Sequence, residues 1–195
     1  MTDSTREAAI SRVGNTIAID GPAGSGKATV SKALAPRLRI GYLDTGAMYR
    51  ALTWYCLDRD IDLTDNAAVA AAANEMPLRL VSDPSDPHVW VGEREITQAI
   101  REPRIALEIK HVSTNLKVRA WMATEQRRRM MEARAQGSGM IAEGRDITTV
   151  VCPDADVRIL LLADQEARLR RRTPELYRDA TQSHIENLLA PLPHR

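Results

Sequence analysis

One run of residues, IAIDGPAGSGKAT at 17–29, constrains the fold of this chain more than any other. Its first residues are apolar and β-branched and stop at a glycine, which is typical of a short buried strand. Residues 29–38 then carry small and apolar side chains at helical spacing. Between the two, Gly21, Gly26 and Lys27 fit the pattern G-x-x-x-x-G-K, which requires a strand before it and a helix after it. The sequence therefore predicts a phosphate-binding loop (P-loop).

The chemistry of such a loop is specific. Glycines let backbone N–H groups curl around phosphate oxygens, and the following helix adds the positive end of its dipole. Lys27 can then reach the β- and γ-phosphates of a nucleoside triphosphate as a mobile charge. The alternative is a glycine-rich turn between strand and helix in which the lysine occurs by chance. The residues expected to bind ATP are Gly21, Pro22, Ala23, Gly24, Ser25, Gly26, Lys27, Ala28 and Thr29.

Ala28 departs from the usual P-loop pattern, in which a hydroxyl at this position contacts Mg²⁺. Alanine offers no oxygen, and Thr29 lies one residue further along the helix. Mg²⁺ readily keeps several of its waters, so phosphates, water and a more distant carboxylate can hold it instead. The change argues against a GTPase-like switch more than against a kinase that acts on small molecules.

The order of the predicted elements indicates an α/β fold with a parallel sheet flanked by helices, because strands and helices alternate along the chain. Residues 40–43 read as a second strand before a helix, residues 115–136 as a long helix, and residues 140–142 and 156–163 as two further buried strands. Residues 61–104 differ. An alanine-rich helix and two strands around the turn-rich SDPSDP predict a small α+β insertion there. We expect a single domain over residues 1–195, with its core at about 14–60 and 105–163 and a tail at about 164–195.

The overall charge excludes some classes of partner. With 27 basic and 26 acidic residues the formal net charge is +1, so no global field favours a nucleic-acid polymer or a membrane surface. The two cysteines, Cys56 and Cys152, form neither a disulfide framework nor a metal-ligand spacing. The polar first residues do not resemble a secretory signal, and no apolar run approaches the length of a membrane span. We expect a cytoplasmic monomer that binds small molecules.

A second group of polar residues lies in LDTGAMYR, residues 43–50. Asp44 and Thr45 fall at the start of a predicted helix, and Arg50 follows about a turn later. A hydroxyl at a helix N-terminus and an arginine one turn on can face one bound anion. The alternative is an ordinary capped helix with a solvated arginine.

A third group lies in IAEGRDITTVVCPDA, residues 141–155, directly after a short buried strand. In open parallel sheets, ligands bind beyond the carboxyl ends of the strands. Glu143 is then placed to order water around Mg²⁺, Arg145 to neutralise a phosphate, and Asp146 to accept a hydrogen bond from an exocyclic amine. The alternative is a loop ion pair between Arg145 and Asp146.

Together, GPAGSGK, LDTGAMYRA and EGRDI-TVV-PDA resemble, in this order and spacing, the motifs of bacterial cytidylate kinases. The resemblance covers residues 17 to about 172, and the second and third motifs are more specific to that family than the P-loop. It implies a P-loop kinase fold that uses ATP and Mg²⁺ and transfers the γ-phosphoryl group to CMP or dCMP. It also implies that residues 61–104 belong to the enlarged acceptor-binding region of the family.

The resemblance assigns roles to individual residues. Arg50 and Arg145 would hold the phosphate of the acceptor, with Asp44 and Thr45 nearby, and Glu143 would hold Mg²⁺ through water. Arg119 and Asp146 would read cytosine, since an arginine donor and a carboxylate acceptor complement its edge and repel that of uracil. A lid would cover the transferring phosphoryl group; the alternative for its arginines is a solvated basic helix face. The residues expected to act in catalysis are Lys27, Arg145, Asp146, Arg168, Arg171 and Arg172.

Three departures from the family pattern leave other functions open. Lys110 stands where the family usually has a serine near the base, which is expected to reshape the pocket. Thr148 replaces a usual glycine and is expected to restrict its loop. The sequence stops at Arg195, where the family's final strand, adenine-side loop and last helix would follow. The alternatives are a catalytically impaired, shortened nucleotide-binding remnant and a P-loop kinase for another small acceptor such as UMP.

Overall fold

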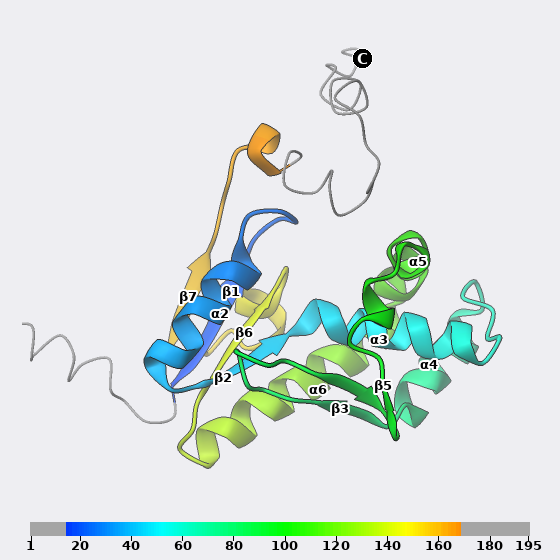
Figure 1. Cartoon of the computed structure of the whole chain (residues 1–195), viewed down its shortest axis with the longest axis horizontal. Helices are drawn as coiled ribbons and strands as arrows, with labels where there is room; N and C mark the ends of the chain where they lie inside the picture. Colours follow the sequence, from blue (N-terminus) through cyan, green and yellow to red (C-terminus); the bar gives the residue numbers. More distant parts are fainter. Residues whose placement is uncertain (1–14, 169–195) are drawn as a thin grey trace, which may run out of the picture.

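The computed structural model describes residues 15–168, and a four-stranded parallel sheet forms the centre of this part of the chain (Figure 1). The strand order is β2-β6-β1-β7, and each neighbouring pair is parallel. In chain order the strands are β1 (Thr16–Asp20), β2 (Gly41–Asp44), β6 (Met140–Gly144) and β7 (Val157–Leu160). The predicted α/β fold with a parallel sheet is confirmed.

Alternate residues of these strands face two separate apolar layers, because successive side chains of a strand point to opposite faces. Ile17 and Ile19 of β1 lie in one layer, with Tyr42, Ile141 and the apolar side of α2 (Lys27–Leu38). Ala18 lies in the other layer, with Leu43, Ala142 and side chains of α3 (Thr45–Asp58) and α6 (Leu116–Ala135). Helices therefore cover both faces, and every residue of β1 is buried.

A second sheet, antiparallel and three-stranded, lies between the two halves of the parallel core in sequence. It follows α4 (Asn66–Glu75) and consists of β3 (Leu78–Leu80), β4 (Val89–Val91) and β5 (Arg94–Glu95). The helix and the first two strands agree with the predicted α+β pattern to within a residue or two at their ends. The sequence did not indicate β5, which has only two residues.

A 3₁₀ turn η1 (Ala99–Arg101) and helix α5 (Pro103–Thr114) connect this sheet to α6. Helix α5 was not predicted from the sequence, although the residues carry a helical signal. Pro103 occupies the first turn, where proline is tolerated, and Ile105 and Val112 are buried two turns apart. Asn115 then caps α6 by accepting from the N–H groups of Lys117 and Val118 at 3.1 and 3.4 Å. This arrangement fixes α5 beside α3, where it reaches the site described below.

The prediction that residues 156–163 form a buried strand is wrong in its burial. Within the described part of the chain β7 pairs only with β1, so it is an edge strand. Ile159 and Leu161 pack on the layer beside α2, but Leu160 and Leu162 are 65% and 68% exposed. Apolar composition alone did not reveal that only one face of this strand is covered.

No helix in residues 15–168 combines the length and the apolar character needed to cross a bilayer.

Candidate active site

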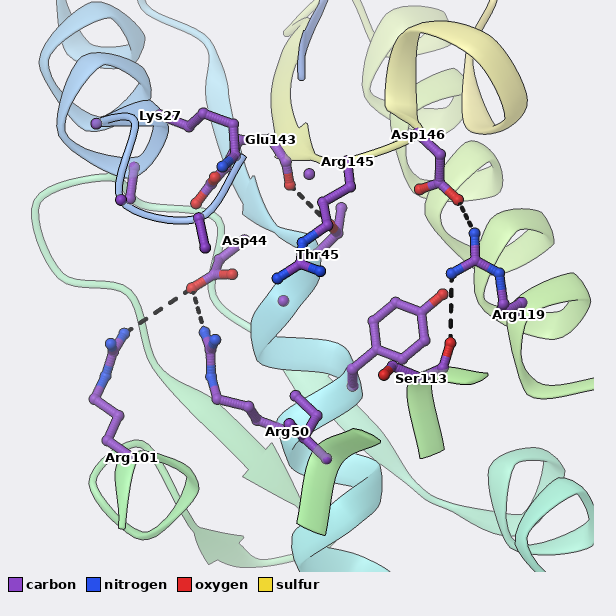
Figure 2. Close-up of a pocket in the computed structure, with 18 of the residues that line it drawn as sticks. Lys27, Asp44, Thr45, Arg50, Arg101, Ser113, Arg119, Glu143, Arg145 and Asp146 are labelled. Atoms are coloured by element: carbon purple, nitrogen blue, oxygen red, sulfur yellow. Dashed lines mark hydrogen bonds and ion pairs between the residues drawn. The ribbon is translucent and has the colours of Figure 1, made fainter. Parts of the chain in front are cut away.

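The carboxyl ends of β1, β2 and β6 open into one cavity of about 770 Å³ (Figure 2). Six segments line it: the P-loop with the start of α2, the end of β2 with the start of α3, η1, the C-terminal half of α5, the first turns of α6, and the end of β6 with the loop after it. The site thus lies at the sheet edge where ligands bind in open parallel folds. The P-loop residues that line it are Ala23, Gly24, Gly26, Lys27, Ala28 and Thr29, whereas Gly21, Pro22 and Ser25 do not.

The P-loop has a geometry suited to an anion. Gly24 and Gly26 have φ angles of 77° and 97°, a left-handed conformation that favours glycine. No side chain caps the N-terminus of α2, so the dipole of the helix faces the cavity without a competing side-chain acceptor. Lys27 is 8% exposed and its Nζ donates to the carbonyl oxygen of Pro22 at 3.0 Å. Burial lowers the pKa of Lys27, and the nearby Glu143, Asp20 and Asp44 carboxylates oppose that change.

Glu143, near the end of the strand next to β1, lies beside Lys27 and is 8% exposed (Figure 2). Its Oε1 accepts from the hydroxyl of Tyr42 at 3.1 Å, and its carbonyl oxygen accepts from Thr45 Oγ1 at 2.7 Å. Burial raises the pKa of Glu143 above the usual 4.5, the Asp44 carboxylate adds to the rise, and Lys27 opposes it. No local sequence pattern indicates a role for Tyr42, whose partner is 101 residues away in the chain.

These side chains suit a Mg²⁺ ion that is held mainly by phosphates and water. Ala28 lines the cavity but supplies no oxygen, and Glu143 offers a carboxylate with one oxygen held by Tyr42. Residues 15–168 contain no group of three or more His, Cys, Asp or Glu side chains arranged around a common point. A dedicated protein cage is thus not present in this region, which accords with the reluctance of Mg²⁺ to lose its waters.

Replacing Glu143 with glutamine is expected to stabilise the protein at neutral pH. Because its pKa is raised in the folded state, the ionised carboxylate costs stability above that pKa, and the cost disappears as the pH falls toward 4.5. The melting temperature of Glu143→Gln should exceed that of the wild type at pH 8, and the difference should disappear as the pH falls toward 4.5. Glu93→Gln, in an exposed turn between β4 and β5, is the control. A less stable Glu143→Gln protein at pH 8 would contradict the expectation.

Asp44 and two arginines form a charged cluster at one end of the cavity (Figure 2). Asp44 caps α3, since its Oδ1 accepts from the N–H of Ala47 at 2.8 Å. Its Oδ2 lies 2.8 Å from Nη2 of Arg50 and 4.0 Å from Nη2 of Arg101. The structure therefore brings Arg50 into the cavity together with an arginine that the sequence analysis missed. No motif marks Arg101, which reaches the site only through the fold of η1.

Arg119 and Asp146 form an ion pair at another end of the cavity, beside Ser113 and Tyr49. Nη1 of Arg119 also donates to the carbonyl oxygen of Ser113 at 3.4 Å. The proposed ion pair between Arg145 and Asp146 does not form, because Asp146 pairs with Arg119 instead. Within residues 15–168 Arg145 makes no ion pair, and Figure 2 shows it between Lys27 and the Arg119–Asp146 pair. Arg50, Arg119 and Arg145, which lie far apart in the sequence, thus line one cavity.

The structure places two of the residues that depart from the family pattern, Lys110 and Thr148. Lys110 is exposed and does not line the cavity; Ile109, Ser113 and Thr114 of α5 do. The expectation that Lys110 reshapes the pocket is therefore wrong, because the face of α5 that meets the cavity passes through its neighbours. Thr148 is not among the residues with a positive φ, so its loop conformation needs no glycine there. Its N–H and its hydroxyl both donate to the carboxylate of Asp20.

Of the lid arginines, only Arg168 falls within the described residues. A Cβ built on Gly24 would lie 2.8 Å from the carbonyl oxygen of Arg168, so this backbone crosses directly over the P-loop. Arg171 and Arg172 lie outside the described residues.

Comparison with known proteins gives a match over residues 17–195 to the family described as Cytidylate kinase. The chain belongs to the cytidylate kinase family. The chain is 42% identical to the cytidylate kinase of Streptomyces avermitilis over 173 residues, covering 89% of this chain and 74% of that protein. It is 44% identical to the cytidylate kinase of Streptomyces coelicolor over 160 residues, covering 82% of this chain and 68% of that protein.

Some similar proteins are longer, and their names include a second activity. The chain is 41% identical to the bifunctional pantoate ligase/cytidylate kinase of Acaryochloris marina over 181 residues, covering 89% of this chain. That alignment includes 34% of the bifunctional protein, so the chain spans about a third of its length.

Proposed function

We propose that this chain transfers the γ-phosphoryl group of ATP to CMP or dCMP, giving ADP and CDP or dCDP. The observation that carries the proposal is the shared cavity that holds the P-loop, the arginines 50, 101 and 145, and the Arg119–Asp146 pair. The P-loop supplies one anion site and the arginines a second, with Arg145 between Lys27 and a polar pair that complements cytosine. Membership of the cytidylate kinase family supports the same reaction.

The proposed division of labour follows from charge and position. The backbone of the P-loop and the N-terminus of α2 bind the triphosphate, and Lys27 follows the charge that moves onto the transferring group. Arg50 and Arg101 leave Asp44 and bind the acceptor phosphate, which is a bidentate acceptor of higher charge. Arg145, which lies between the two anion sites, neutralises the phosphoryl group in transit.

Base selection is assigned to the other end of the cavity. Asp146 accepts from the exocyclic amine of cytosine, and Arg119 donates to its ring nitrogen and carbonyl oxygen. Glu143, oriented by Tyr42 and Thr45, would hold Mg²⁺ through water. When bound, the metal ion neutralises phosphate charge and keeps the reacting groups in line. We place the reaction in the cytoplasm, because ATP and CMP are present there.

The test is a coupled assay of ADP formation with purified full-length chain, ATP, Mg²⁺ and a panel of acceptors. CMP and dCMP are expected to give turnover, and UMP to give at least about tenfold less. Turnover with UMP or another acceptor in the absence of turnover with CMP would favour the alternative kinase. Binding of ATP without turnover of any acceptor would favour the impaired remnant.

Arg101 provides a prediction that is independent of the family motifs. Arg101→Ala is expected to raise the KM for CMP about tenfold, because it removes one charged contact to the acceptor phosphate. The KM for ATP should change by less than about twofold, since Arg101 lies on η1, away from the P-loop. Arg104→Ala is the matched control, because this nearby arginine pairs with Glu102 and does not line the cavity. An unchanged KM for CMP in Arg101→Ala would exclude Arg101 from acceptor binding.

A further inference from the structure

Asp20, the last residue of β1, has a buried carboxylate that the roles proposed above do not use. It is 4% exposed and lies directly before the P-loop. Its Oδ1 accepts from the N–H of Ile147 at 2.8 Å, and its Oδ2 accepts from the N–H of Thr148 at 2.8 Å and from the hydroxyl of Thr148. A buried carboxylate bound by three donors is rigid, because any loosening leaves a charge unpaired in a poorly solvated place.

The three donors belong to the first two residues of the π-helical turn η2 (Ile147–Val151), which directly follows a short loop that contains Arg145 and Asp146. The beginning of that loop is also fixed, since Thr45 Oγ1 donates to the carbonyl oxygen of Glu143 at 2.7 Å. Between the two anchors the packing is tight: a Cβ built on Gly144 would lie 2.7 Å from both Thr45 Oγ1 and Ile147 Cδ1. Arg145 and Asp146 are thus held between two fixed points, one on α3 and one on β1.

We propose that Thr148 and Asp20 are positioning residues that set where Arg145 and Asp146 meet the acceptor; this rests on the proposed function. Any residue at position 148 except proline supplies the backbone N–H, but the third donor requires a hydroxyl. The carboxylate belongs to the last residue of β1, so the bond anchors the acceptor loop to a fully buried strand of the parallel sheet. Thr148 therefore restrains this segment, whereas a glycine at the same position would leave its backbone more mobile.

The test uses two substitutions of Thr148 and one of its neighbour in the full-length protein. Thr148→Val keeps the shape and removes the hydroxyl, and Thr148→Ser restores the hydroxyl on a smaller side chain. Thr149→Val is the matched control, since Thr149 is the exposed residue next in the chain. Hydrogen–deuterium exchange over residues 144–152 measures the order of the loop without any ligand, and calorimetric titrations measure affinity for CMP and for ATP.

Thr148→Val is expected to exchange about tenfold faster over this segment than the wild type and to bind CMP about 5- to 20-fold more weakly. Its affinity for ATP should change by less than about twofold, because the P-loop backbone itself is unaltered. Thr148→Ser should recover most of both losses, and Thr149→Val should match the wild type.

Equal weakening of CMP and ATP binding by Thr148→Val would overturn the proposal, because it would indicate a general structural defect. Exchange that is the same in Thr148→Val and in the wild type would also overturn it. Should the wild type fail to bind CMP, the proposed function fails, whereas the exchange measurement still decides whether the hydroxyl orders the loop.

Discussion

Lys27→Ala is expected to lower kcat for CMP phosphorylation about 10³-fold while the protein stays folded. Lys27 is buried and lines the cavity, and the proposed reaction moves negative charge past its ammonium group. Its Nζ donates to the carbonyl oxygen of Pro22, a contact that an incoming phosphate replaces with a stronger charged one. The measurement is kcat at saturating CMP and ATP together with the dissociation constant for ATP.

Arg37→Ala is the control for that experiment, because Arg37 is an exposed cation in the last turn of the same helix. Its kcat should equal that of the wild type. The backbone of the P-loop is unaffected by either change, so ATP should still bind to Lys27→Ala, with about tenfold lower affinity. A kcat for Lys27→Ala within threefold of the wild type would show that the P-loop does not hold the reacting phosphates.

Features written in consecutive residues were predictable. The strand, loop and helix at residues 16–38 follow from local composition and glycine placement, and the structure has them as β1, the P-loop and α2. The meeting of three motifs in one cavity was also foreseeable, because parallel strands place their carboxyl ends on one edge of the sheet. Arg50 and Arg145 reach the cavity for that reason, because they follow β2 and β6, whereas Arg119 reaches it from helix α6.

Features that depend on distant partners were not predictable. Tyr42 and Glu143 lie on different strands, and their bond exists only because β2 pairs with β6. Arg101 follows a short antiparallel sheet whose turns decide where η1 points. The predicted burial of β7 was wrong for a related reason, since the composition of a strand does not indicate which neighbouring elements cover each of its faces.

Thr148 shows which part of a substitution can be inferred from sequence. A residue that replaces glycine is expected to restrict its loop, and the backbone of Thr148 needs no left-handed conformation that would require glycine. The restraint comes from a bond between its side chain and a carboxylate 128 residues earlier in the chain. The sequence did not indicate Asp20 as the partner, because no local pattern connects Asp20 to this segment.

Asp146→Asn is expected to lower kcat/KM for CMP by about 10²- to 10³-fold and to reverse part of the preference over UMP. Asparagine can place an amide donor where the carboxylate accepted, so the amine of cytosine meets a second donor. The O4 oxygen of uracil is an acceptor and suits that amide. Arg119 also loses its charged partner, which weakens the hold on both bases. The measurement is kcat/KM for CMP, dCMP and UMP at saturating ATP.

Asp154→Asn is a close control, because Asp154 forms a two-point ion pair with Arg127 of α6 outside the cavity, at the same sequence separation as Asp146 and Arg119. It removes an equivalent charge and should leave the CMP-to-UMP ratio unchanged. If Asp146→Asn lowers activity toward CMP and UMP by the same factor, Asp146 orders Arg119 but does not read the base. If instead the ratio of kcat/KM for CMP to kcat/KM for UMP falls, the carboxylate contacts the exocyclic group of the base itself. An electrostatic effect through Arg119 alone would act on both pyrimidines alike.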